Sequence, residues 1–172
     1  KPIRKEDAEF FKKTYSFPGA FVSIYRRGPG GQEIHYQDKK TNPQITIMGG
    51  DENYLAVSGY TLIQGRNLNE QDIQSGRNIC ILGNAVAVTL FGDKPERCLD
   101  KIVRVSGAPY RVVGLLKAKG SSAMMRQDDV IVTSYNNIRK YGNASNSYLM
   151  GVMVANVKEI DPAAGQATAY FR

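Results

Sequence analysis

Residues 101–116 read KIVRVSGAPYRVVGLL, two extended stretches of apolar residues on either side of the turn sequence SGAP at 106–109. Branched and aromatic residues flanking Gly and Pro in this way predict an antiparallel hairpin. We expect one face of the hairpin to be buried. The side chains expected on it are Val103, Val105, Val112 and Leu115.

Outward from this hairpin, residues 49–127 consist mainly of short extended pieces separated by turns, the clearest being 60–63, 79–82, 101–105 and 110–116. One helix interrupts them. We expect it to start at Asn84 as N-cap and to end before Gly92, because Asn caps well and Gly ends helices. The middle of the chain is therefore predicted to be mostly β.

Both flanks mix helices and strands. The N-terminal flank predicts a helix over 4–14 with Ala8, Phe11 and more loosely Phe10 on its apolar side. A strand over 20–27 is expected to return through the turn GPGG into a second strand over 33–39, followed by a strand over 44–48. The C-terminal flank predicts a strand over 130–133, a short helix through Ile138, a strand over 149–155 and a final helix opened by Asp161-Pro162.

This order predicts an α+β fold in which a β-rich lobe is inserted into a mixed α/β lobe formed by both chain ends. We expect residues 1–48 and 128–172 to form the discontinuous α/β lobe and residues 49–127 the inserted lobe. The segment 119–127 between them is polar and is expected to be a mobile loop.

The composition is that of a globular protein. The chain has 172 residues, 42% hydrophobic and 23% charged, which fits about one domain. No apolar run approaches the roughly 18 residues of a membrane-spanning helix. The start at Lys1-Pro2 suggests a piece of a longer protein. The 23 basic residues exceed the 16 acidic ones but are scattered, so a solvated surface is favoured over a nucleic-acid interface.

The residues offer no catalytic or metal-binding set. His35 is the sole histidine and is expected to be an exposed strand residue. The pairs Asp51-Glu52 and Asp128-Asp129 are adjacent, and adjacent side chains in extended backbone diverge. One His and two Cys do not make a zinc site, and GPGG lacks the Lys-Ser/Thr of a phosphate loop. We therefore expect no enzyme activity, metal or cofactor.

Two pairs of sulfur-containing residues allow alternatives. Cys80 and Cys98 are able to pair as a disulfide in an oxidising compartment, but a secreted chain with two cysteines need not pair them, and small buried thiols are the alternative. Met124 and Met125 are expected to contact cargo or a second copy of the chain, because two adjacent thioethers cannot both face inward in a regular element. Core packing remains the alternative for at least one of them.

Residues 49–114 resemble the MacB-like periplasmic core domain of ABC-transporter permeases, a group that includes MacB, the Lol lipoprotein permeases and FtsX. The likeness rests on four pieces in order: GDENYL at 50–55 with SGYTL at 58–62, GRNL at 65–68 with Asp72, ICILGN at 79–84 through LFG at 90–92, and KIVRV at 101–105 with YRVVGL at 110–115. The motif positions that we expect to be structural are Tyr54, Gly65, Arg66, Asp72, Phe91, Val113 and Gly114. Arg66 is expected to clamp Asp72, and Asn69 with Asp72 has the spacing of a capping box.

The chain departs from the family pattern at two places. Leu99-Asp100 stands where the family usually has Ile-Gly, and the strand that links the first membrane helix to the domain is not found in the sequence.

The resemblance implies a Porter-like α/β lobe carrying an inserted, Sabre-like β-rich lobe. It implies a non-catalytic domain facing the periplasm at the inner membrane and connected to flanking membrane helices. The partners implied are a second permease protomer and a cytoplasmic ATP-binding domain or subunit, with a periplasmic adaptor and an outer-membrane channel as further candidates. The domain would couple ATP turnover to capture or extrusion of a substrate. A self-standing periplasmic ligand-binding module is the alternative.

Overall fold

The computed structural model describes residues 1–120, 127–141 and 147–154. The final helix expected from residue 161, and Met124 and Met125, lie outside them. The elements are α1 (Lys5–Thr14), β1 (Ala20–Arg27), β2 (Ile34–Tyr36), β3 (Lys39–Lys40), β4 (Thr46–Gly50), α2 (Tyr54–Val57), β5 (Leu62–Gly65), α3 (Glu70–Ser75), β6 (Ile79–Leu82), α4 (Asn84–Phe91), the 3-10 helix η1 (Pro95–Cys98), β7 (Ile102–Val105), β8 (Ala108–Leu116), β9 (Val130–Ser134), α5 (Tyr135–Ile138) and β10 (Leu149–Val154).

The described strands form one ten-stranded mixed sheet in the order β10-β1-β4-β9-β6-β8-β7-β2-β3, with β5 also paired to β8. Two pairs are parallel, β4 with β9 and β6 with β8. Strand β1 bridges two parts of the sheet, because residues 20–25 pair with β10 and residues 26–27 pair with β4. A strand from the N-terminal flank and one from the C-terminal flank, β1 and β10, therefore lie side by side in the sheet. The expected lobe boundaries near residues 49 and 127 stay a prediction.

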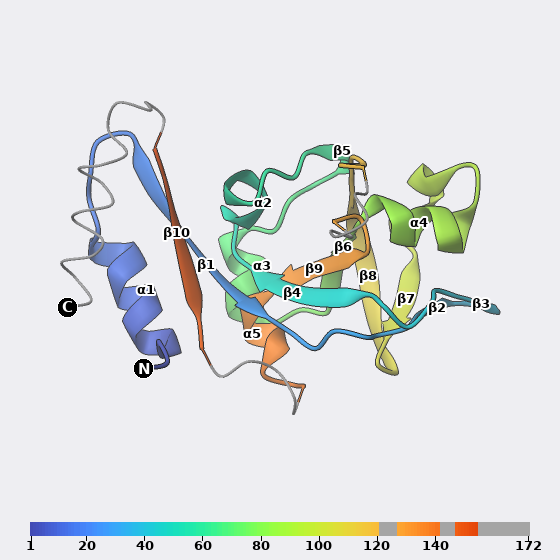
Figure 1. The fold of residues 1–172 in the computed structure, drawn as a ribbon, viewed down its shortest axis with the longest axis horizontal. Coiled ribbons are helices and arrows are strands. Elements are labelled where there is room, and N and C mark those ends of the chain that lie inside the picture. Colours follow the sequence, from blue (N-terminus) through green and yellow to red (C-terminus); the bar gives the residue numbers. More distant parts are fainter. Residues whose placement is uncertain (121–126, 142–146, 155–172) are drawn as a thin grey trace.

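The molecule is elongated, with α1, β1 and β10 at one end and β2, β3, β7 and α4 at the other (Figure 1). Helix α1 packs on β1, and α2 contacts both β1 and β10. Within the described ranges, no helix has the length and apolar character needed to cross a bilayer. Helices and a mixed sheet together confirm the α+β class.

The hairpin over residues 101–116 is confirmed. Val105 pairs with Ala108, so the turn consists of Ser106 and Gly107, with φ of 51° and 82°. Positive φ at both positions is the geometry of the tight turns that match strand twist. The four side chains expected on the buried face all lie in the largest apolar cluster, which α4 covers.

The expected pairing of residues 20–27 with residues 33–39 is wrong. After β1 the chain continues beside β4, where the Gly28 amide donates to the Ile47 carbonyl at 2.8 Å and Gln32 bridges to Ile45. A Cβ on Gly28 would lie 2.6 Å from that carbonyl oxygen, so the glycine serves a close backbone approach. Strand β2 instead pairs with β3 and β7.

Two side chains in the helices differ from expectation. Phe10 is 63% exposed while Ala8 and Phe11 are buried, because at 100° per residue Phe10 lies too far around α1 to share their face. Helix α4 has Gly83 rather than Asn84 at its N-cap position. The Asn84 side-chain amide donates to the Leu116 carbonyl at 3.3 Å, which links α4 to β8.

Candidate functional site

A fully buried carboxylate, Asp51, lies where β4 ends, next to the end of the molecule that holds α1. It accepts hydrogen bonds from the Ser23 hydroxyl at 2.9 Å, the Ile24 amide at 2.7 Å and the Asn53 amide at 3.0 Å. Lys12 of α1 donates to it at 2.8 Å. Four donors from α1, β1 and the turn before α2 thus meet at one side chain, which we call the Asp51 joint.

Lys12 also contacts the Glu52 carboxylate, so one ammonium is shared by two neighbouring acids. The expectation that Asp51 and Glu52 diverge is wrong, because the chain turns after β4 and is not extended there. Burial on its own would lower the pKa of Lys12, but the hydrogen bonds to both carboxylates outweigh burial and hold its pKa above the ordinary value. The ammonium therefore stays charged at neutral pH.

A second contact fastens α1 to the helix that follows β9. The Tyr135 hydroxyl donates to Glu9 at 2.6 Å. Burial is the larger cause and this hydrogen bond to a carboxylate the second cause of a raised pKa of Tyr135. The phenol therefore keeps its proton and remains a donor. Helix α1 is thus held to the body of the domain by polar contacts at two positions, Glu9 and Lys12.

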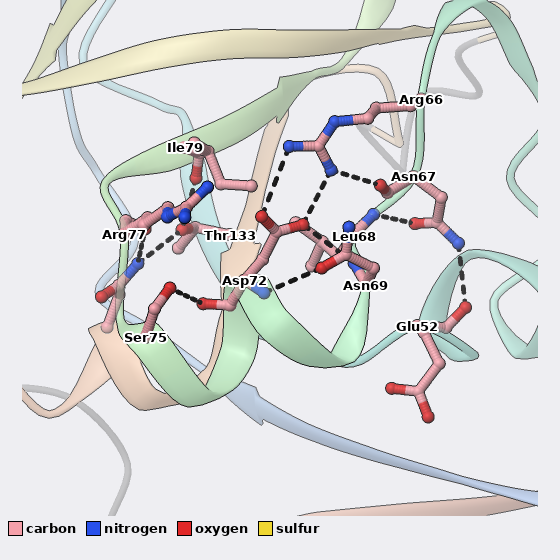
Figure 2. Close-up of polar contacts among 11 residues, drawn as sticks. Glu52, Arg66, Asn67, Leu68, Asn69, Asp72, Ser75, Arg77, Ile79 and Thr133 are labelled. Carbon is pink, nitrogen blue, oxygen red and sulfur yellow. Dashed lines mark hydrogen bonds and ion pairs between the residues drawn. The ribbon is translucent and has the colours of Figure 1, made fainter.

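The Arg66–Asp72 ion pair expected from the sequence is present (Figure 2). Arg66 donates to the two carboxylate oxygens of Asp72 at 2.7 and 3.3 Å. The capping box is also confirmed: the Asp72 amide donates to Asn69 Oδ1 at 2.8 Å, and the Asn69 amide donates back to Asp72 at 2.9 Å. The carboxylate therefore fixes both the loop after β5 and the start of α3.

The environment of Asp72 favours its charged form. Burial on its own would raise the pKa of Asp72, but the hydrogen bonds from Arg66 and from the Asn69 amide outweigh burial, and the pKa lies below its ordinary value. The side chain is therefore ionised at neutral pH.

Polar contacts connect the Asp51 joint with the Arg66–Asp72 pair. The Asn67 side-chain amide donates to the Glu52 carbonyl at 2.8 Å, and Arg66 donates to the Asn67 carbonyl at 3.0 Å (Figure 2). Contacts therefore run from Lys12 through Glu52 and Asn67 to Arg66. Sequence reasoning missed the first part of this path, because Lys12 lies far from Asp51 and Glu52 along the chain and no local motif marks the contact.

The backbones of β5 and β8 cross closely at Gly65 and Gly114. A Cβ on Gly65, whose φ is 81°, would lie 2.2 Å from the Val113 carbonyl oxygen and 2.8 Å from Gly114 Cα. The Arg66 amide donates to that Val113 carbonyl at 2.8 Å. The structure thus brings five of the expected motif residues together: Gly65, Arg66, Asp72, Val113 and Gly114.

The two aromatic motif residues lie elsewhere. Tyr54 is buried at the start of α2, with its ring 5.4 Å from that of Tyr25. Phe91 ends α4 and packs on Tyr36, with ring centroids 4.4 Å apart. Asp100, at the place where the family usually has Gly, has a φ of 64°, the left-handed region that favours glycine.

The histidine and the two cysteines lie apart from the Asp51 joint and from the Arg66–Asp72 pair. His35 is half-exposed in β2 and faces Glu33 at 3.4 Å. Cys80 and Cys98 are free thiols buried in the largest apolar cluster. No group of three or more His, Cys, Asp or Glu side chains able to hold a metal occurs among residues 1–120, 127–141 and 147–154. What the arrangement does provide is a buried polar connection between elements.

A cleft of about 530 Å³ lies beside the Asp51 joint. Its lining includes acidic and basic side chains from α1, α3 and the turn after β4, together with residues of α5. The polar ones are Glu9, Lys12, Lys13, Glu52, Glu70, Gln74, Tyr135 and Asn136.

Comparisons with known proteins agree with this architecture. The family model of the MacB-like periplasmic core domain matches residues 1–170. The macrolide export ATP-binding/permease protein MacB of Chlorobaculum tepidum is 30% identical over 145 residues, which is 83% of this chain and 22% of that protein. The uncharacterized ABC transporter permease YvrN of Bacillus subtilis is 27% identical over 128 residues, 74% of this chain and 30% of that protein. The chain thus spans less than a third of either relative.

Solved structures show the same fold. The periplasmic region of MacB from Actinobacillus actinomycetemcomitans superposes with a TM-score of 0.70 at 18% identity, over 99% of this chain and 75% of that one. The extracellular domain of the transporter YknZ from Gram-positive bacteria gives a TM-score of 0.67 at 21% identity, over 94% of this chain and 78% of that one.

Proposed function

The chain belongs to the MacB-like periplasmic core domain family, and from this premise we propose that it transmits movement within an ABC transporter permease. In this proposal, ATP binding on the cytoplasmic side moves the membrane helices, and the domain carries that movement to the place where cargo is captured or expelled. The partners are a second permease protomer and an ATP-binding domain or subunit. An adaptor and an outer-membrane channel are further partners to be tested.

The Asp51 joint is the observation that supports this proposal. Movement entering at α1 reaches the rest of the domain only if α1 is held rigidly, and an apolar contact alone would let a helix slide. Directional hydrogen bonds to a buried charge fix one geometry, since breaking any of them leaves a buried polar group without a partner. Lys12 and Glu9 provide such bonds between α1 and the body.

Transmission also requires a differential interaction with cargo. A ligand that binds two arrangements of the domain equally well does not shift the equilibrium between them. The proposal therefore places cargo between two copies of the domain, in a space whose shape changes as the β-rich middle of each copy swings.

The test is a pair of double variants in the complete transporter. Lys12→Met with Asp51→Asn removes the buried ion pair, and Arg4→Met with Asp7→Asn removes an exposed ion pair on the same helix as a matched control. We expect the first variant to lose at least tenfold in cargo export while ATP hydrolysis changes less than twofold, and the control to behave as wild type.

Export is followed with a macrolide or pyoverdine, the cargoes named for relatives of this chain. Deletion of the whole domain should likewise abolish export and spare basal ATP hydrolysis. Normal export by a folded Lys12→Met, Asp51→Asn transporter would show that α1 does not drive the domain, and a passive docking platform would become the better account.

A self-standing ligand-binding module is the second candidate, and the cleft of about 530 Å³ beside α1 favours it, since small-molecule sites are commonly of this size. The sequence of the complete protein distinguishes the two functions. Membrane helices on either side of this chain would exclude the self-standing module.

A further inference from the structure

A second cleft, of about 300 Å³, lies at the opposite end of the molecule from α1. Strands β2, β3 and β7 and helix α4 lie at the end of the molecule away from α1 (Figure 1). The residues that line the cleft come from β2, β3 and the turn between them, from α4, and from η1 and the segment that joins η1 to β7. Its lining residues are Tyr36, Gln37, Lys39, Leu90, Phe91, Arg97 and Lys101. None of the motif residues except Phe91 belongs to it, and it is separate from the Asp51 joint.

An aromatic pair forms the apolar part of this cleft. The rings of Tyr36 and Phe91 lie 4.4 Å apart at 35°, and both side chains are half-buried against the largest apolar cluster. Leu90 beside them is 1% exposed. The rings therefore present a surface held in place by the core, on which a planar group can stack.

The polar part of the cleft is cationic. Lys39, Arg97 and Lys101 line it, and no lining residue is acidic. Among the described residues, none of these three cations has a carboxylate within ion-pair distance, whereas Arg4, Lys12 and Arg66 each have one. Three cations without an ion-pair partner around one concave surface raise the local concentration of anions.

Fixed backbone places these cations. Lys39 lies directly opposite Tyr36 in the β2–β3 ladder, so its side chain starts beside the ring on the same face. The amide of Lys101 donates to the Cys98 carbonyl at 3.1 Å, and Asp100 before it donates to the Val112 carbonyl at 2.8 Å. The charges thus extend from anchored positions rather than from a free loop.

We propose that this cleft binds an anion that carries a planar apolar ring, of the class of aromatic carboxylates. The ring stacks on Tyr36 and Phe91, and the carboxylate accepts hydrogen bonds from Arg97 and from the ammonium groups of Lys39 and Lys101. Neither a neutral ring nor a small inorganic anion uses both halves of the site. This inference does not depend on the proposed transmission of movement.

The test compares 2-naphthoate with its neutral analogue 2-naphthalenemethanol by isothermal titration and by amide chemical shifts at low ionic strength. We expect 2-naphthoate to bind at least tenfold more tightly, to shift amides of β2, α4 and η1, and to weaken as salt is added. Arg97→Gln and Lys101→Gln should each weaken it at least fivefold. Lys94→Gln, an exposed cation that does not line the cleft, should leave affinity unchanged.

Equal binding of the neutral analogue would overturn the proposal, and so would an effect of Lys94→Gln as large as that of Arg97→Gln. Absence of binding at millimolar concentration would also overturn it. If an acidic peptide binds at this cleft while 2-naphthoate does not, the surface is a protein-docking site and the proposal is wrong. Phe91→Leu keeps the charges, and we expect it to weaken 2-naphthoate more than acetate.

Discussion

The end of the molecule built from α1, β1 and β10 and the part of the sheet beneath α4 are stabilised in different ways. Residues from the middle of the chain form most of the second region, which we call the middle. The middle holds an apolar cluster of sixteen buried residues. The end holds two clusters of five and three, and is fastened to the body through a buried carboxylate and a lysine. Apolar packing is non-directional and tolerates small shifts, whereas the polar joint needs every donor in place. The two regions should therefore respond differently to substitution.

The largest effect is expected for Asp51→Ala. It removes the acceptor of the Ser23 hydroxyl and of the Ile24 amide, and it leaves Lys12 with Glu52 alone. Breaking a buried pair costs about 3–5 kcal/mol of unfolding free energy. Urea unfolding measures the change. Asp38→Ala, at an exposed carboxylate, should stay within about 0.5 kcal/mol. A loss below about 1 kcal/mol for Asp51→Ala would mean that the joint is not what holds the end in place.

The next largest effect is expected in the middle, where the backbones of β5 and β8 approach closely at Gly65 and Gly114. Gly65→Ala adds a Cβ 2.2 Å from the Val113 carbonyl oxygen and forces alanine into a positive φ, which together should cost about 3 kcal/mol. Gly107→Ala is the matched control. Its φ of 82° is nearly the same, but nothing lies within 4 Å, so we expect a loss of only about 1 kcal/mol. Equal losses in urea unfolding would show that the crossing is not tight.

A smaller, pH-dependent effect is expected for Arg66→Met. The lowered pKa of Asp72 stabilises the fold above the ordinary carboxyl pKa of about 3.9, and this stabilisation is lost as pH falls through the lower pKa of the folded state. Without Arg66, the variant should lose about 1 kcal/mol at pH 7, because the arginine is half exposed and partly screened.

Unfolding at a series of pH values checks this sign. The difference between wild type and Arg66→Met should shrink as pH falls through the lowered pKa of Asp72, because the carboxyl then becomes protonated in both proteins. A difference that grows with acid would contradict the assignment. Arg4→Met, at an exposed pair on α1, should show no measurable pH-dependent difference.

The smallest effect concerns thiol reactivity, which reports on the middle alone. Burial raises the pKa of Cys98 to about 11 and raises that of Cys80 further, so neither forms thiolate at pH 8 in the closed protein. Iodoacetamide labelling should be negligible and should rise sharply in Gly65→Ala. In Asp51→Asn, labelling should rise less than threefold if the end built from α1, β1 and β10 unfolds without exposing the core that holds the two thiols. Fast labelling of the wild type would place the thiols outside the core.

Local patterns in the sequence predicted much of the middle. Spacing predicted the Asn69–Asp72 capping box, and the family motif marked the Arg66–Asp72 pair, whose two members are six residues apart. Alternation around a Gly-containing turn predicted the β7–β8 hairpin and its buried valines. Each of these features depends on neighbours along the chain.

The end was harder to predict because its partners are remote. Turn residues at 28–31 marked a bend but not the partner strand, and β1 pairs with β10 rather than with the next strand. The sequence indicated only a loop carboxylate at Asp51, because Lys12 and Ser23 lie far from it along the chain. Whether movement passes through the joint is likewise not a property of any local pattern.

The central claim, that nucleotide binding moves the middle of the domain through α1, is tested most directly by pulsed electron paramagnetic resonance on the complete transporter. A spin label at Asp93→Cys, an exposed site just after α4, reports the distance between the two copies, while the buried native thiols stay unlabelled. We predict one distance without nucleotide and a different one with ATP bound, and no such shift in Lys12→Met with Asp51→Asn. The same distance in both nucleotide states, in a transporter that still exports cargo, would contradict the account.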